Sequence, residues 1–152
     1  MFKYSLAVLA FAATLTHAQQ TPIGFVKTVS GEAAVVTEGK RQAAALGTPV
    51  FQGSLLQTGP KGSMGVTFKD NTVMSFGPDT QLTVDEYLYA PSQGKLKLGT
   101  QLTRGTLNYI SGSIAKLKPE AVSVGTPTGT IGVRGTHFVV KVDPAAPRVA
   151  AN

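Results

Sequence analysis

The sequence contains no cysteine and no tryptophan, and only two of its 152 residues are histidines. The absence of cysteine excludes disulfides and thiol chemistry. His17 lies in the leader described below, so His137 is the only histidine left for the folded domain. A zinc site built from cysteine and histidine ligands is therefore not expected, and we predict no metal and no cofactor.

The chain also lacks any segment with the length and 3.6-residue period of an amphipathic helix. Instead, 17 glycines separate short runs in which apolar and polar residues alternate, a pattern typical of strands and turns. We predict an all-β domain, either a short-stranded irregular β-roll that resembles a solenoid or a sandwich. No clean repeat unit is present.

The first 18 residues have the order of a secretory signal peptide. Lys3 precedes an apolar run over 6–15, and Thr16-His17-Ala18 offers small residues at a cleavage point. The apolar run is too short to span a bilayer as a stable helix. We expect cleavage after Ala18, a periplasmic or secreted product and no integral membrane segment after cleavage; a retained membrane anchor is the alternative.

The remaining chain divides into a β domain over 23–142 and a proline- and alanine-rich tail over 143–152, which we expect to be disordered. The whole chain has 14 basic and 8 acidic residues, a net charge of +6. The basic residues form no stripe, so we predict no nucleic-acid binding. Their surplus favours an anionic surface in the cell envelope.

The alternation also predicts how strands pair. Strands over 23–29 and 32–37 should form a hairpin around Ser30-Gly31. Residues 63–87 should form a three-strand meander with a tight turn at Asp70-Asn71, since both residues tolerate positive φ. Residues 88–94 should form a surface loop.

Few side chains suit catalysis. No serine lies in a nucleophile-elbow context. The glycine-rich segment 125–135 matches no phosphate-binding loop. Neighbours on a strand point to opposite faces, so the adjacent Asp85 and Glu86 should not share a site. We predict no catalytic residue and no enzyme; the alternative is an envelope enzyme acting on glycans through carboxylates among Asp70, Asp79, Asp85 and Glu86.

One arginine stands alone in the apolar, glycine-rich stretch 122–142. Arg134 either holds a glycine corner together in a buried network or is presented to the carboxylate or phosphate of a partner. We favour the structural role. On that hypothesis Arg134→Ala would lower the melting temperature, at about 1–3 kcal/mol for a lost buried network.

Several segments, taken in order, resemble the FecR domain family. They are Gly24 to Val26, Val29 to Val35, Gly47 to Gly59, Ser63 to Leu82, Gly105-Thr-Leu107, and the closing pair Thr126-Pro127 and Arg134-Gly135-Thr136. The resemblance covers most of residues 23–142. Ser54 stands where the family commonly has aspartate, and Asn71 where it commonly has glycine.

The resemblance implies an all-β periplasmic domain without a known catalytic role. In the family's signalling members this domain follows a cytoplasmic anti-sigma segment and a transmembrane helix, and receives a signal from an outer-membrane transporter. This sequence shows neither segment, so the resemblance implies a stand-alone exported member that does not itself contact a sigma factor. We expect it to bind an unidentified protein or envelope component, with Arg134 as a candidate contact; a self-associating structural protein is the alternative, and the oligomeric state stays open.

Overall fold

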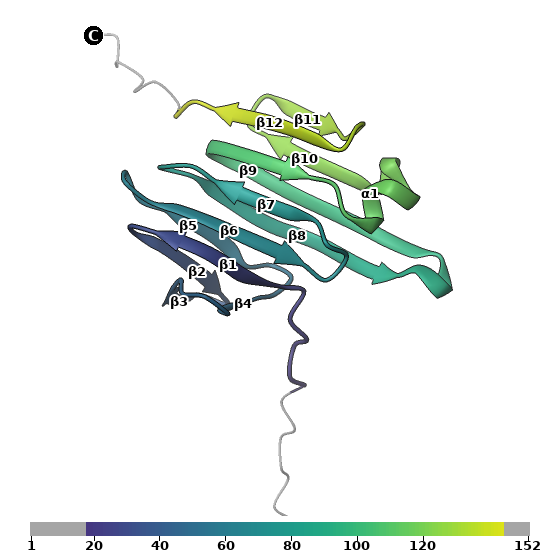
Figure 1. Ribbon diagram of the computed structural model, residues 1–152, viewed down its shortest axis with the longest axis horizontal. Coiled ribbons are helices and arrows are strands. Elements are labelled where there is room, and N and C mark those ends of the chain that lie inside the picture. Colours follow the sequence, from purple (N-terminus) through teal and green to yellow (C-terminus); the bar gives the residue numbers. More distant parts are fainter. Residues whose placement is uncertain (1–17, 145–152) are drawn as a thin grey trace, which may run out of the picture.

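The computed structural model describes residues 18–144 (Figure 1). The expected signal peptide and tail therefore lie almost wholly outside the described residues. The all-β prediction is confirmed, because strands dominate and the only α-helix in the described part is the short α1 (Ser113–Leu117). Among residues 18–144, no helix has the length and apolar character needed to cross a bilayer.

The strands are β1 (Gly24–Ser30), β2 (Ala33–Thr37), β3 (Lys40–Ala43), β4 (Pro49–Val50), β5 (Leu55–Thr58), β6 (Ser63–Phe68), β7 (Val73–Phe76), β8 (Gln81–Ala90), β9 (Lys95–Ile110), β10 (Val122–Thr126), β11 (Gly129–Gly132) and β12 (His137–Val142). Two 3₁₀ turns, Pro91–Gln93 and Pro119–Ala121, complete the order.

The strands form a curled open sheet whose two halves are joined through β9. The first half-sheet has the order β3-β2-β5-β8-β9, and β10 and β11 follow on the other side of β9. The second half-sheet has the order β4-β1-β6-β7-β9-β12. Of the two expected architectures the sandwich is nearer, because the two halves enclose one core.

Four long chain segments cross from one half-sheet to the other, and each contributes one strand to each half. These segments therefore follow one another in the same order in both halves. These segments are β1–β2, β5–β6, β7–β8 and β9 itself. β1 pairs with β6, whereas β2 pairs with β5, so β1 and β2 are two legs of one bent strand. The predicted hairpin between them is wrong.

The predicted three-strand meander over 63–87 is half right, because its third strand crosses to the other half-sheet. β6 and β7 form the expected hairpin, with Asn71 at φ +67° in its turn. β8, however, crosses to the first half-sheet and pairs with β5 and β9. The expected loop over 88–94 is also partly wrong, because β8 continues to Ala90 and only a 3₁₀ turn and Gly94 separate it from β9.

Glycines allow the four segments to bend side by side. We call this row of bends the corner. Gly105 bends β9 with φ +96°, and a Cβ there would overlap the Cα and Oγ1 atoms of Thr80. Gly31 has φ +66°, and a Cβ there would overlap the Lys61 carbonyl oxygen. Only glycine fits such close backbone approach at positive φ.

Buried threonines satisfy the backbone groups that the corner takes out of the strand ladders. The Thr80 amide donates to Thr58 Oγ1 (2.9 Å), and Thr80 Oγ1 accepts from the Thr106 amide (3.0 Å). Thr58 Oγ1 in turn donates to the Gly77 carbonyl (2.6 Å). These bonds matter because an unpaired buried amide or carbonyl costs about as much as a lost hydrogen bond.

Apolar side chains from both half-sheets meet in one core cluster. The largest fully buried ones are Leu56, Leu82, Leu98 and Leu102 from the first half-sheet and Met64, Phe68, Met74, Leu107 and Tyr109 from the second. Alternate residues of β7, and of β8 as far as Val84, contribute, as the period of two predicts. The core therefore fixes which face of each half-sheet is outside.

The two ends of the curled sheet differ. At one end the loop between β3 and β4 joins the two halves. The Ala44 amide donates to the Ala33 carbonyl of β2 (2.9 Å), and the Gly47 amide donates to the Val26 carbonyl of β1 (2.8 Å). At the other end, β11 and β12 pair only with β10 and β9 in the described chain. Figure 1 shows this open end, with β11 and β12 farthest from β3 and β4.

Candidate functional site

The four outermost strands are protected to different extents against pairing with another chain. Exposed strand edges bind other strands unless charges, proline or short length prevent it. β3 carries Lys40 and Arg41 and is exposed throughout, β4 has two residues and begins with Pro49, and β11 has four residues with glycine at each end. Three of the four edges are thus protected.

β12 lacks most of these protections. It has six residues, His-Phe-Val-Val-Lys-Val, and pairs with β9 in a regular register along its whole length. Its only basic residue of fixed charge, Lys141, forms an ion pair with Asp143 (3.5 Å). Of these four outermost strands, β12 therefore offers the longest unprotected edge.

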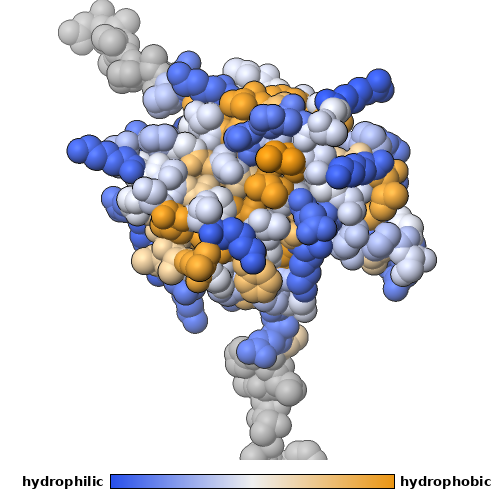
Figure 2. Space-filling view, viewed as in Figure 1, coloured by the Kyte–Doolittle hydropathy of each residue, from blue (hydrophilic) through white to orange (hydrophobic). Residues whose placement is uncertain are grey.

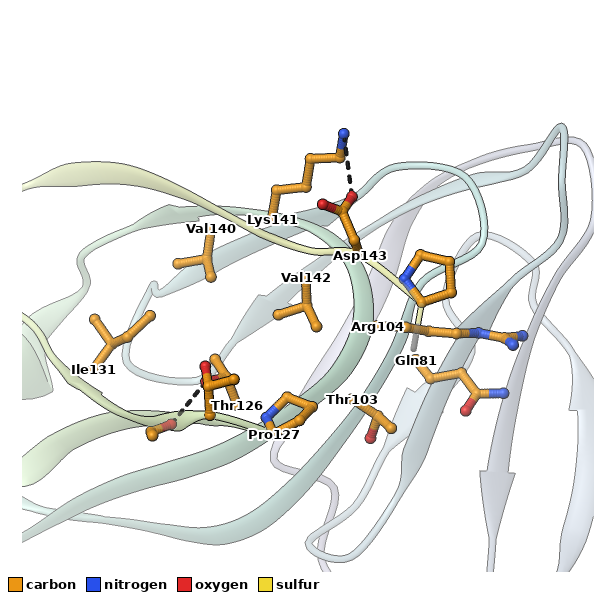
Figure 3. A pocket seen from close by; sticks show the side chains of 13 residues that line it. Gln81, Thr103, Arg104, Thr126, Pro127, Ile131, Val140, Lys141, Val142 and Asp143 are labelled. Atoms are coloured by element: carbon orange, nitrogen blue, oxygen red, sulfur yellow. Dashed lines mark hydrogen bonds and ion pairs between the residues drawn. The ribbon is translucent and has the colours of Figure 1, made fainter. Parts of the chain in front are cut away.

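A groove of about 850 Å³ lies between β12 and the β10–β11 hairpin (Figure 3). Val140 and Val142 point into it from β12, and Ile131 faces them from β11. Thr126 and Pro127 line the opposite wall, and Thr103, Arg104 and Gln81 lie at one end. The groove is thus mainly apolar, with polar groups gathered at its end.

The outer face beside β12 is mixed, with two exposed aliphatic side chains. Val139 is 61% exposed and Ile110 of β9 is 43% exposed, and the register of β12 places both on the outer side of the second half-sheet. Figure 2 shows apolar side chains, in orange, across the middle of the molecule in this view, with hydrophilic side chains, in blue, between and around them. A strand added to β12 would find aliphatic contacts on both of its faces.

The closing motif expected from the sequence is divided between two places. Thr126 and Pro127 line the groove, where Thr126 Oγ1 donates to the Gly129 carbonyl (2.8 Å). Arg134 and Gly135 line a separate depression beside Glu120. Thr136 and Gly135 hold the start of β12 to β9, since the Ser111 amide donates to the Thr136 carbonyl (2.9 Å) and Ser111 Oγ to the Gly135 carbonyl (2.8 Å).

The buried network expected around Arg134 is absent. The Arg134 side chain is exposed, and within the described residues it makes no hydrogen bond and no ion pair. The carbonyls of Gly135 and Thr136, which such a network would have used, accept from Ser111 instead. The Arg134 side chain is therefore exposed to solvent and accessible to a partner.

We expect Arg134→Ala to change the free energy of unfolding by less than about 0.5 kcal/mol, as is usual for exposed side chains without partners. Urea unfolding of the two proteins at the same pH measures this. A loss of more than about 1 kcal/mol would show that Arg134 does stabilise the turn before β12.

The carboxylates that sequence analysis considered for catalysis do not converge on one site. Asp70 is fully buried, and Asp79 lies in the turn between β7 and β8. Asp85 and Glu86, however, share a shallow depression, contrary to expectation, because a bulge in β8 at Asp85 shifts the alternation and exposes both. Glu86 there pairs with Lys97 (3.5 Å).

Asp70 instead organises a buried polar cluster. Its carboxylate accepts from Thr72 Oγ1 (2.7 Å), from the Thr72 amide (3.3 Å), from the Tyr87 hydroxyl (3.0 Å) and from the Ile114 amide at the start of α1 (3.1 Å). These bonds join the β6–β7 turn, β8 and α1. Because no surface of Asp70 is exposed, the cluster is suited to stabilising the fold rather than to contacting a substrate.

Two tyrosines near this cluster are hard to ionise. Burial, and secondarily the negative charge of Asp70, raises the pKa of Tyr87 well above its ordinary value. Burial raises the pKa of Tyr109 to about 12. Unlike Tyr87, the Tyr109 hydroxyl has no hydrogen-bond partner, although Thr72 and Ser111 lie close to it.

We expect Tyr109→Phe to make the protein more resistant to alkali. The unfolded tyrosine ionises near pH 10 and the folded one near pH 12, so the stabilisation from the neutral phenol is complete below pH 10 and is lost as the pH rises to about 12. The variant should lack this loss, which amounts to at most about 1.4 kcal/mol per pH unit. Urea midpoints at pH 8 and pH 11 measure it.

At pH 8 the same variant should be as stable as the parent or slightly more stable, because it removes a hydroxyl that has no partner. Tyr87→Phe is the contrasting variant: it removes a bond to the Asp70 carboxylate and should cost about 1.5–3 kcal/mol. If Tyr109→Phe and the parent lose the same stability between pH 8 and pH 11, the raised pKa of Tyr109 is refuted.

Sequence reasoning did not identify the groove or the edge of β12. Val140, Val142 and Ile131 appeared only as alternating apolar residues, which is also the pattern of core strands. The signal that marks β12 is comparative: it is longer and less protected than the other three edges. That comparison requires the pairing of every strand.

A family profile described as "FecR: FecR protein" matches residues 54–151, well over half of the chain. The match begins at β5, although β1–β4 belong to the same curled sheet. Among curated proteins none matches the chain, and among solved structures none does. FecR domains are known in regulators of envelope signalling and are generally regulatory rather than catalytic. The match confirms the resemblance for the segments from residue 54 onward, and the chain belongs to the FecR family.

Proposed function

We propose that this protein is a non-catalytic, exported binding module that receives a protein partner of the cell envelope along the edge of β12. The observation that carries the proposal is the long unprotected edge of β12 beside an apolar groove. Backbone hydrogen bonds to a free edge supply affinity, and pockets for alternate side chains supply specificity.

The residues on both sides of β12 support this mode of binding. Side chains on the groove side of an added strand would contact Val140 and Val142, and those on the other side would contact Val139. Burial of such aliphatic contacts contributes about 25 cal/mol for each Å² removed from water. The absence of a convergent set of catalytic groups among the described residues is in keeping with a binding role.

Position-specific crosslinking in the envelope tests the proposal. A photoreactive amino acid placed at the position of Val139, in the full chain and in cells that express it, should give one defined crosslinked product. The matched control places it at Gln42, on the protected edge strand β3, where the side chain is also exposed. Products from both positions alike, or from neither, would contradict the proposal.

A further inference from the structure

We infer that the occupant of the β12 edge is an extended segment that carries a carboxylate side chain near each of its ends. The inference rests on the proposed function and specifies the chemistry of the partner. It follows from how charge is placed along β12, together with the length of that strand.

An arginine without an ion-pair partner stands near each end of β12. Arg134 precedes the first residue of the strand, His137, by three positions. Arg104 is next to Gly105, which pairs with the last residue, Val142. Both side chains are exposed, and neither forms an ion pair within residues 18–144.

The carboxylates beside these two arginines form no ion pair with them. Glu32 and Asp79 share a depression with Arg104, and Glu32 pairs with Arg41 instead. Lys141 and Asp143 form an ion pair with each other, and in Figure 3 Lys141 points away from the groove. His137 bonds to the Asn108 side chain on the outer face. Glu120 shares the depression of Arg134 but forms no ion pair with it. Each end of the edge therefore carries an arginine that lacks an ion pair, and the charged side chains between them, Lys141 and Asp143, pair with each other.

The middle of the edge is apolar, which fixes the rest of the partner's pattern. Val140 and Val142 line the groove and Val139 lies on the outer side, so the central residues of the added strand should be small and apolar or β-branched. Six residues of strand extend about 17 Å. The two carboxylates should thus be about six residues apart, with an extended apolar segment between them.

Defined peptides test the inference directly. The acidic probe is acetyl-Glu-Val-Thr-Val-Thr-Val-Glu-amide; a second probe has lysine in place of both glutamates, and a third has proline in place of the central valine. Binding to the full chain is followed by amide chemical shifts at low salt. The acidic probe should bind about tenfold more tightly than the lysine probe, as two exposed ion pairs allow, and should shift the resonances of β12 and of 126–131. The proline probe should not bind.

A charge-reversed protein separates these two arginines from the general positive charge of the surface. Arg104→Glu with Arg134→Glu should reverse the preference, so that the lysine probe binds more tightly than the acidic one. The matched control is Lys40→Glu with Lys95→Glu, which makes the same change of net charge at exposed positions on β3 and at the start of β9. The control should keep the preference for the acidic probe.

Equal affinity for the acidic and lysine probes, binding of neither, or shifts away from β12 would each overturn the inference. A crosslinked product from position 139 with twice the mass of the chain would also overturn it, because a second copy would then occupy the edge. If position 139 gives one envelope partner but the probes show no charge preference, the proposed function stands and this inference fails. If position 139 gives no product, the proposed function fails whatever the probes do.

Discussion

Replacing Gly105 with alanine is expected to destabilise the folded chain by about 2–6 kcal/mol. Part of this is backbone strain, since φ is +96° at Gly105 and such strain costs about 1–3 kcal/mol. The rest is overlap of the new Cβ with Thr80, whose buried backbone is held by bonds to Thr58 and Thr106. Overpacking of this kind costs about 1–3 kcal/mol more. Urea unfolding measures the total.

Gly39→Ala is the matched control, because Gly39 also has positive φ (+76°) but has open space where a Cβ would lie. It should show strain alone, about 1 kcal/mol. The difference between the two variants therefore measures the close approach of β9 and Thr80 at the corner. Equal losses would mean that the corner tolerates a side chain and that the bend in β9 does not depend on glycine.

Asp70→Ala is expected to cost about 4 kcal/mol, because it leaves four buried donors without their acceptor. They are the Thr72 amide, Thr72 Oγ1, the Tyr87 hydroxyl and the Ile114 amide. Each unsatisfied buried donor costs about 1–3 kcal/mol, although the losses are not additive. The melting temperature should fall by roughly 10–20 °C.

Two further variants separate the charge of Asp70 from its position. Asp70→Asn keeps the shape and one acceptor oxygen but turns donors toward donors, so it should lie between the parent and Asp70→Ala. Asn71→Gly, one residue on, relieves positive φ (+67°) and should leave stability nearly unchanged. A small loss for Asp70→Ala, similar to that for Asn71→Gly, would show that the cluster reorganises around water.

The sequence predicted the strands better than their partners. Alternation located β6, β7 and the start of β8 closely, because period two depends only on which residues face the core. It could not show that Gly31 marks the bend of one strand rather than the turn of a hairpin. Glycine at positive φ suits a bend and a hairpin turn equally. Which of the two forms depends on pairing with β6 and β5, which lie far along the chain.

The candidate site was predicted only in part. Thr126 and Pro127 were selected by family resemblance, and they do line the groove. Arg134 was assigned to a buried network. Testing that assignment requires knowing which groups donate to the carbonyls of Gly135 and Thr136, and the donor is Ser111, from a distant segment. Asp85 and Glu86 were wrongly placed on opposite faces, because a bulge is not visible in the alternation of one strand.

The bent strands have a consequence for how the protein unfolds. β1–β2, β5–β6, β7–β8 and β9 each belong to both half-sheets, so neither half can open without breaking the ladder of the other. These segments should lose their amide protection together, as one cooperative unit. β10, β11 and β12 do not cross the corner and lie outside that unit. The edge proposed to receive a partner can therefore rearrange, or exchange its amides, while the remainder of the sheet stays folded.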